Sequence, residues 1–186
     1  MARWAPDAAG RLKASALELF AARGFASVTA AEIAARAGMT ERSFFRHFRA
    51  KEDVLFADHS GVGEALVAAI AAAPAPARAR ALMQGVADLL GERFGGQREE
   101  HRRLARVVRD EPALRAREAL RDHDWARAIA RGFERRGFAA PRAALLAAAT
   151  ATTFRVAYDG WLDDASDRTL AARFAQLLET LAADLE

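Results

Sequence analysis

The sequence contains no cysteine, a single tyrosine and three methionines, and lysine occurs only at Lys13 and Lys51. Without cysteine the chain cannot form disulfide bonds, zinc ribbons or a thiol nucleophile. The four histidines lie in no HExxH or ExxH arrangement, which would place two ligands on one helical face. Asp122, His123 and Asp124 are consecutive, and successive helix positions point about 100° apart, so they cannot converge on one metal ion. We therefore expect no enzyme, no cofactor and no metal site.

Long apolar runs are also lacking. The alanine-rich stretches near 65–73 and 143–154 are too short to span a bilayer, and no secretory signal precedes the first predicted helix. We therefore expect a soluble cytoplasmic protein with no membrane partner.

Hydrophobic residues make up 52% of the 186 positions, which is enough for a real core. Alanine, leucine and arginine abound while valine, isoleucine and tyrosine are scarce, so the composition favours helices over strands. Apolar periodicity and Gly/Pro breaks predict an all-α architecture of nine helices, three or four in a compact head and five in a larger bundle. The expected ranges are 8–23, 30–37, 41–47, 51–73, 77–95, 98–109, 113–136, 141–163 and 167–185, and the expected domains are 1–50 and 51–186.

The net charge of +3 is too small to indicate a nucleic-acid partner, but its distribution is uneven. Residues 1–60 carry nine Lys/Arg and seven Asp/Glu, whereas residues 159–186 carry two Lys/Arg and seven Asp/Glu. Phosphate would repel the acidic C-terminal stretch. Any contact with DNA should therefore lie toward the other end of the chain.

The segment from Thr29 to Lys51, TAAEIAARAGMTERSFFRHFRAK, predicts two short helices joined by a turn at Gly38. A helix-turn-helix needs this arrangement, and glycine can adopt the positive φ that turns the chain sharply. Thr40 should cap the second helix. Four residues of the first helix and the turn should face inward: Ile33, Ala34, Ala37 and Met39.

The predicted second helix, ERSFFRHF, divides into two faces. Phe44 and Phe48 should pack on a set of apolar residues from the two preceding helices, Leu19, Phe20 and Ile33. The outer face should carry Arg42, Ser43 and Arg46, with Phe45 at its edge. Guanidinium groups there could reach guanine edges or phosphates, and a phenyl ring could contact a thymine methyl or a sugar. From spacing alone, a helical hairpin with a solvated basic face is an equally good interpretation.

This segment resembles the DNA-binding signature of the TetR family of regulators over about 45 consecutive residues without a gap. The matching positions are Phe20 through Gly24, Val28-Thr29, Glu32-Ile33-Ala34, Ala37-Gly38-Met39-Thr40, Phe45, His47-Phe48, Lys51-Glu52 and Leu55. The resemblance implies a three-helix head and a helix that links it to a ligand domain. It also implies a two-fold dimer that reads a palindromic double-stranded operator in successive major grooves.

Carried over position by position, the resemblance implies that Thr29 anchors the first motif helix to phosphate. Thr40, Arg42, Ser43 and Arg46 would form the recognition surface, His47 would touch the DNA backbone, and Lys51 would bind phosphate. The family usually has tyrosine where this chain has Phe45, so a hydroxyl contact to phosphate is lost there. We expect Phe45 to act through apolar contact.

The C-terminal region predicts either a plain helical core or a ligand pocket, because aromatic residues at helical spacing serve both. Its sequence is similar, from RRLARVVRDEPALRAREALRDHDWARAIA to FRVAYDGWLDD, to TetR-type regulators that bind acyl-CoA-like molecules. That similarity implies an apolar tunnel for an acyl chain, with arginines for phosphates. The expected lining is Leu90, Phe94, Leu104, Val108, Trp125, Ile129, Phe133, Phe154 and Tyr158. A salt-bridged solvent face is the alternative interpretation of the arginines.

The resemblance further implies a homodimer through residues 141–185, where small residues such as Ala144, Ala148 and Thr152 permit close helix packing. It also implies a repressor that leaves its operator when a small-molecule effector displaces the helix at 51–73. A helical interaction module without DNA binding is the other function to be tested, and it would leave the Thr29–Lys51 pattern unexplained.

Overall fold

The computed structural model describes residues 7–59 and 61–184, and within them the chain is helical with no strand. The predicted all-α fold class is therefore confirmed. The helices are α1 (Ala8–Arg23), α2 (Ala30–Arg36), α3 (Glu41–His47), η1 (Lys51–His59), α4 (Val62–Ala72), α5 (Ala79–Phe94), η2 (Gly95–Gln97), α6 (Arg98–Asp110), α7 (Pro112–Arg135), α8 (Ala140–Asp163) and α9 (Leu170–Asp184). The segments η1 and η2 are 3₁₀ helices.

One predicted helix is wrong in its extent. The expected continuous helix at 51–73 is divided into η1 and α4, and Gly61 adopts a φ of 75° just before α4 begins. This left-handed conformation cannot continue a right-handed helix, and glycine adopts it without a Cβ penalty. The apolar periodicity on both sides of Gly61 is real, but it belongs to two elements.

The chain forms two compact units. The first, here called the head, comprises the described part of residues 1–60 together with Arg102–Ala119. The second, here called the bundle, comprises Gly61–His101 and the described part of 120–186. This division differs from the predicted boundary between residues 50 and 51, because the end of α6 and the start of α7 join the head. The chain therefore passes between the units three times.

A single hydrophobic core holds the head together. Leu12, Phe20, Ile33 and Phe44 are almost fully buried in it, from α1, α2 and α3. The second passage of the chain adds three more buried residues from α6 and α7, namely Leu104, Val108 and Leu114. Because these lie at least 45 residues beyond the end of η1, the head depends on sequence far outside the helix-turn-helix.

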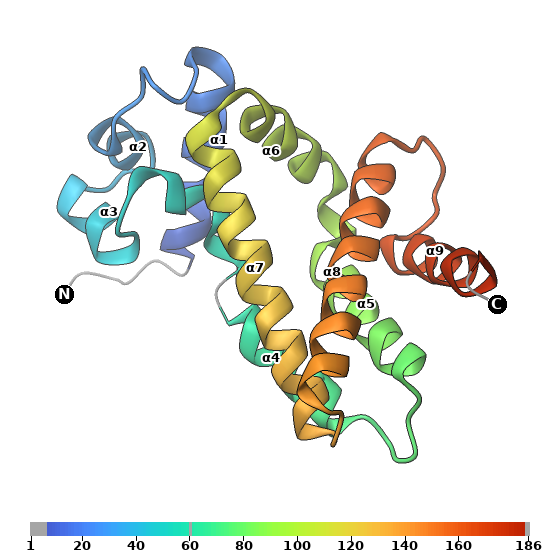
Figure 1. Cartoon of the computed structure of the whole chain (residues 1–186). Coiled ribbons are helices and arrows are strands. Elements are labelled where there is room, and N and C mark those ends of the chain that lie inside the picture. Colours follow the sequence, from blue (N-terminus) through green and yellow to red (C-terminus); the bar gives the residue numbers. More distant parts are fainter. Residues whose placement is uncertain (1–6, 60, 185–186) are drawn as a thin grey trace. The chain divides into compact units, whose positions relative to one another are not determined.

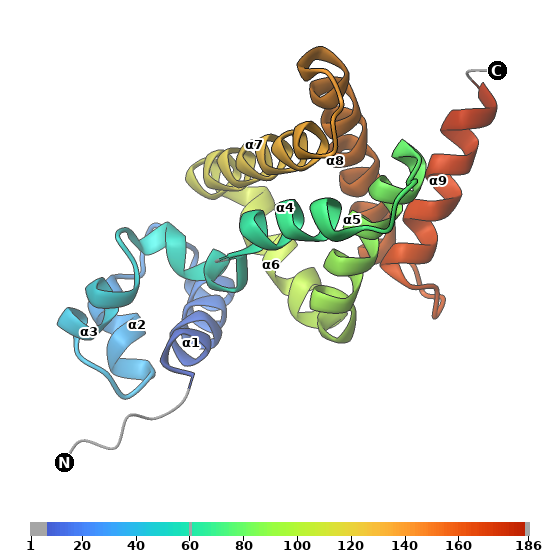
Figure 2. The ribbon, with the colours of Figure 1, turned by 90° about the horizontal axis from the view of Figure 1, so that it is seen from below.

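The bundle is built on longer helices, and α5, α8 and α9 pack against one another within it (Figures 1 and 2). The inner face of α9 is a stripe of Leu170, Phe174 and Leu178, all buried at four-residue spacing. Small residues let the helices approach closely: a Cβ on Gly132 would lie 2.8 Å from Ile70 Cδ1.

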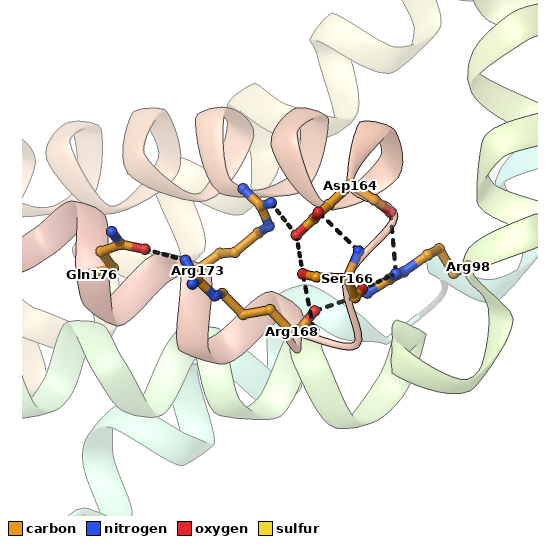
Figure 3. Close-up of polar contacts among 6 residues, drawn as sticks. All are labelled: Arg98, Asp164, Ser166, Arg168, Arg173 and Gln176. Atoms are coloured by element: carbon orange, nitrogen blue, oxygen red, sulfur yellow. Dashed lines mark hydrogen bonds and ion pairs between the residues drawn. The ribbon is translucent and has the colours of Figure 1, made fainter.

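The connection between α8 and α9 is held by a polar clamp (Figure 3). The Arg98 guanidinium donates to the carbonyl oxygens of Ser166 and Arg168, at 2.8 Å each, and lies 5.1 Å from the Trp161 ring centroid. The Asp164 carboxylate accepts from the Ser166 amide at 2.9 Å and pairs with Arg173. These hydrogen bonds from Ser166 and Arg173 keep the pKa of Asp164 well below its usual value. The clamp fixes the turn that pairs the last two helices.

By length and composition alone, Lys51–Ala72 is the one candidate membrane span among the described residues. Gly61 interrupts it, and Leu55, Leu66 and Ile70 are buried within their own units. Buried apolar side chains at helical spacing explain its hydropathy without a membrane.

Candidate nucleic-acid interface

The turn between α2 and α3 is built around Gly38, whose φ is 71°. The amide of Gly38 donates to Ala35 O at 3.0 Å, and the amide of Met39 donates to Ala34 O at 2.8 Å. This pattern satisfies the last carbonyls of α2 and redirects the chain. The four residues predicted to face inward do so: Ile33 and Ala34 are fully buried, Ala37 is buried and Met39 is half-buried.

Both motif helices begin with a threonine cap. Thr40 Oγ1 accepts from the Ser43 amide at 3.2 Å, as the sequence predicts for α3. Thr29 and Glu32 form a capping box on α2, in which the Glu32 carboxylate accepts from the Thr29 amide at 2.8 Å and from its hydroxyl at 2.9 Å. The Thr29 amide, Arg23 and the Thr29 hydroxyl together lower the pKa of Glu32 to about 2. Seven-residue helices are too short to persist without such ends.

The two faces of α3 are as predicted. Phe44 is fully buried and Phe48 nearly so, with their ring centroids 5.4 Å apart. On the opposite side Arg42 and Arg46 are exposed, and Phe45 is 51% exposed. Buried phenylalanines therefore fix the helix on the head while its other side faces solvent.

The arginines of this face have no partners within residues 7–59 and 61–184. Arg42, Arg46 and Arg49 form no ion pair and no side-chain hydrogen bond there. By contrast, Arg23 pairs with Glu32 at 2.8 Å, and Arg36 pairs with Glu18 at 2.5 Å. Three arginines without partners among the described residues thus lie close together in sequence, on and just after α3.

Lys51 lies differently from a simple surface cation. Its ammonium group donates to the carbonyl oxygens of Phe25 and Val28, at 2.7 Å each, and stands 4.0 Å from the Phe25 ring centroid. Thr29 likewise uses both its amide and its hydroxyl in the capping box. The structure therefore joins these two predicted site residues through one loop, residues 25–29, ahead of α2.

His47 ends α3 and is half-buried. Its Nε2 atom is buried and has no hydrogen-bond partner among the described residues. Ser43 is also half-buried, and its hydroxyl lies 3.1 Å from Thr40 Oγ1. Within α3, the predicted site residues that are exposed are therefore Arg42, Phe45 and Arg46.

Sequence reasoning missed an ion pair that ties η1 to the first half of α7. The Arg117 guanidinium donates to Asp53 Oδ1 at 2.6 Å, and Asp53 Oδ2 accepts from the Ala50 amide at 3.1 Å. Spacing cannot reveal a partner 64 residues away.

The predicted effector residues do not all lie together. Leu104 and Val108 belong to the core of the head, whereas the other seven lie in the bundle. Phe94 stacks on Trp125 with centroids 6.2 Å apart, and Phe154 stacks on Tyr158 at the same distance. Leu90, Ile129 and Phe133 are almost fully buried. The similarity to acyl-CoA regulators implies that all nine residues line one tunnel, but the structure divides them between the head and the bundle.

The bundle also contains a hydrogen-bonded pair, His101 and Tyr158, that no pattern in the sequence predicts. His101, which is 3% exposed, shares a 2.7 Å hydrogen bond between its Nδ1 and the Tyr158 hydroxyl. The rings of Phe94 and Trp161 lie edge-on to the imidazole, with centroids 5.0 and 6.0 Å away. The four histidines offered only a search for metal motifs, and the described residues contain no cluster of three or more metal-ligating side chains.

Comparison with known proteins now bears on this geometry. Residues 12–57 match the family described as bacterial regulatory proteins of the tetR family, and residues 80–186 match the MftR C-terminal domain, one of the TetR C-terminal families. The second match covers more than half of the chain. The chain belongs to the TetR family of regulators. This TetR family consists of transcriptional regulators, not enzymes, in agreement with the sequence-based expectation.

A curated relative is the HTH-type transcriptional regulator TcmR of Streptomyces glaucescens, which is 36% identical over 124 residues. The match covers 62% of this chain and 54% of TcmR, so this chain spans about half the length of that relative.

Two solved structures share the TetR fold. One is the repressor FadR of Thermus thermophilus in complex with lauroyl-CoA, with 22% identity, a TM-score of 0.57, and coverage of 94% of this chain and 93% of FadR. The other is a protein of Syntrophomonas wolfei assigned to the TetR family, with 15% identity, a TM-score of 0.66 and 97% coverage of both chains. At these identities the likeness concerns the fold.

Proposed function

We propose that this TetR-family chain is a cytoplasmic homodimeric repressor that binds a palindromic DNA operator through α3 and leaves it when an effector occupies the bundle. The observation that carries the proposal is the outer face of α3. Arg42 and Arg46, without partners among the described residues, accompany an exposed aromatic ring on a helix fixed by buried Phe44 and Phe48, and Arg49 follows just after it. Unpaired guanidinium groups on a protruding helix suit phosphates and guanine edges.

The central contacts would be made by Arg42, Phe45 and Arg46, with Thr40, Ser43 and His47 at their margins. Dimer symmetry would place two such helices one DNA turn apart, about 34–36 Å. A solvated basic face would be the alternative, and it predicts no sequence-dependent affinity.

The direct test is Arg46→Ala against the matched control Arg131→Ala, an exposed arginine of α7 that has no partner among the described residues. Binding to the DNA upstream of the protein's own coding sequence is measured by fluorescence anisotropy. Loss of one arginine contact should weaken specific binding by roughly 1–3 kcal/mol, about five- to 150-fold, while the control stays near wild type. Equal affinity for both variants would contradict the assignment of this face.

Lys51 and Thr29 are proposed to act on DNA through the loop 25–29. With its ammonium group on two carbonyl oxygens, Lys51 would shape the approach to α2, and Thr29 would set where that helix begins. Lys51→Ala should then reduce operator affinity without changing its salt dependence. A salt slope lower by about one would instead indicate a direct phosphate contact.

The dimer is proposed to form through α8 and α9, within residues 141–185. One side of α8 is buried, at Ala143, Ala147 and Thr150, while the other leaves apolar groups exposed. Leu145 is 73% exposed and Val156 is 52% exposed, with small Ala148 and Thr152 between them on the same helical face. Leu181 of α9 is 39% exposed. Such a face suits a self-complementary two-fold interface.

Leu145→Asp should shift the protein from dimer to monomer in light scattering and weaken operator binding in parallel. Leu120→Asp is the matched control, because Leu120 is 61% exposed on α7 outside this face. Dimers that survive Leu145→Asp but not Leu120→Asp would place the interface elsewhere.

The effector is proposed to be a small molecule with an apolar, acyl-CoA-like chain. The relevant groups of the bundle are its aromatic side chains, Phe94, Trp125, Phe154 and Tyr158, beside the apolar Leu90, Ile129 and Phe133. Arg127, Arg131 and Arg135 are exposed at four-residue spacing on α7 and could meet phosphates. The lauroyl-CoA complex of FadR makes this class a reasonable first probe. Leu104 and Val108 are left out because they lie in the head core.

Tryptophan fluorescence offers a test, since Trp125 stacks on Phe94. Lauroyl-CoA should change the emission saturably and lower operator affinity, while coenzyme A alone should do neither. Trp125→Phe should remove most of the fluorescence response. No saturable change with lauroyl-CoA would reject this effector class and leave the DNA-binding proposal standing.

Coupling would run along the chain where it passes between the units. A ligand can shift the balance only by its preference for one state, typically about 1–3 kcal/mol. Lauroyl-CoA should therefore lower operator affinity by about five- to 150-fold at saturation. An increase in affinity would indicate an activating ligand in place of a releasing one.

A further inference from the structure

Phe45 is a large apolar side chain that the head leaves in solvent. Among the described residues the other large exposed hydrophobic side chains are Leu120, Leu145, Val156 and Leu181, all in the bundle. Leu145, Val156 and Leu181 lie on the face proposed for the dimer, and Leu120 stands alone on α7. Phe45 lies instead on the outer side of a seven-residue helix, 51% exposed, and a core role is therefore excluded.

The ring is held in place from below. Its centroid lies 5.3 Å from that of Phe44, with an interplanar angle of 80°, and Phe44 is fully buried. This edge-to-face contact is a favoured geometry for aromatic pairs and restricts the motion of the outer ring. Phe45 is thus an exposed apolar side chain whose orientation is stabilised by the buried ring of Phe44.

The charged surroundings of Phe45 indicate what it faces. Arg42 lies one helical turn before it and Arg46 next to it, both exposed and without partners among the described residues. An apolar docking site for another protein would instead be expected to extend over several hydrophobic neighbours. A single ring between guanidinium groups suits a polyanion that carries a small apolar feature.

In the major groove of DNA that feature is the C5-methyl group of thymine, which projects as an apolar group beside the hydrogen-bond donors and acceptors of the base edges. We propose that Phe45 is a specificity-determining residue that reads a thymine methyl in each half-site. The inference rests on the DNA-binding function proposed above. It adds one defined base preference, which the arginines by themselves would not supply.

The test uses the full chain and a duplex selected from random sequence by the wild-type protein. Each thymine is replaced in turn by deoxyuridine, which pairs identically but lacks the methyl group. At one symmetric position per half-site, wild-type affinity should fall about fourfold for each methyl removed, the equivalent of about 0.8 kcal/mol per buried carbon. Phe45→Ala should bind all these duplexes equally.

Arg46→Ala serves as the matched variant, since it should bind more weakly overall and keep the same uracil penalty. Thermal melting checks that Phe45→Ala folds like the wild type, as expected for an exposed side chain. Binding without any uracil penalty, or a penalty that persists in Phe45→Ala, would overturn this inference alone. Failure to recover any duplex at low salt would overturn the proposed DNA-binding function and this inference with it.

Discussion

The head and the bundle reach the same all-helical state by different means. In the head, α2 and α3 have seven residues each and depend on defined ends: the capping box of Thr29 and Glu32, the Thr40 cap and the turn at Gly38. In the bundle, α8 has 24 residues and no side-chain cap at its start. Its stability comes from a long buried stripe. Short helices are specified at their ends and long helices along their faces.

This difference has a functional side. Helix ends hold α3 in one orientation, as a surface that must fit a groove requires. A bundle stabilised along its faces is expected to adjust to a ligand through its side-chain packing. The predictions below test this contrast, from the largest expected effect to the smallest.

The largest effect should come from the buried side of each unit. Phe44→Ala and Phe174→Ala each remove a fully buried ring, and each should lower the free energy of unfolding by about 3–5 kcal/mol in urea titrations. Hydrogen exchange should show the first loss in α1–α3 and the second in α8 and α9. The exposed neighbour Phe45→Ala should change stability by less than about 0.5 kcal/mol. Equal exchange throughout the chain for both core variants would mean that the units unfold as one.

Glycine substitutions should have opposite signs in the two units. Gly38→Ala introduces a Cβ at a φ of 71° and should cost about 1–2 kcal/mol, because left-handed backbone is strained for alanine. Gly85→Ala places a Cβ in open space on the exposed side of α5 and should stabilise by about 0.5–1 kcal/mol. Thermal melting measures both. If both substitutions shift the melting temperature in the same direction, the head is not specified at its helix ends in the way proposed here.

The smallest expected effect is a change in the pH dependence of stability through the Glu32 carboxylate. The pKa of Glu32 is depressed from 4.5 to about 2, so the folded state binds fewer protons than the unfolded state between those values. Its contribution is complete above pH 4.5 and is lost as the pH falls through about 2. Glu32→Gln, which keeps the capping hydrogen bonds but not the charge, should therefore melt below the wild type at pH 6. The gap in melting temperature should narrow toward pH 2.5.

Glu41→Gln is the control for that series, since the Glu41 side chain makes no hydrogen bond with the described residues. Its melting temperature should follow the wild type over the whole range. A constant gap for Glu32→Gln from pH 6 to pH 2.5 would show that the carboxylate charge adds nothing to the cap.

The sequence predicted the head in detail because its determinants are local. Thr40 three residues before Ser43, Gly38 between two short helices and the four-residue spacing of Phe44 and Phe48 each act over a single turn. The positive φ at Gly61 was not predicted, because the same glycine would also be tolerated within an exposed helix. The contribution of α6 and α7 to the head core, through Leu104, Val108 and Leu114, could not be inferred from the sequence. Local periodicity shows that one face of a helix is buried, but it does not show which element covers that face.

The bundle's site was harder to predict for the same reason. Trp125 and Ile129 were expected in the lining, their four-residue spacing is typical of one helical face, and both are buried. The hydrogen bond between His101 and Tyr158 joins residues 57 positions apart, and it required knowledge of how α6 meets α8. Which aromatic groups would touch a ligand depends on how the helices pack together, and the residue pattern of a single helix does not give this.

The ammonium group of Lys51 has a practical consequence. The only other lysine, Lys13, is 3% exposed, and Lys51 must leave the carbonyl oxygens of Phe25 and Val28 before its nitrogen can act as a nucleophile. Side-chain acylation by an amine-reactive ester should therefore be slow and should follow transient opening at the α1–α2 loop. The rate of acylation at Lys51, followed by mass spectrometry with and without operator, would therefore measure how often this part of the head opens.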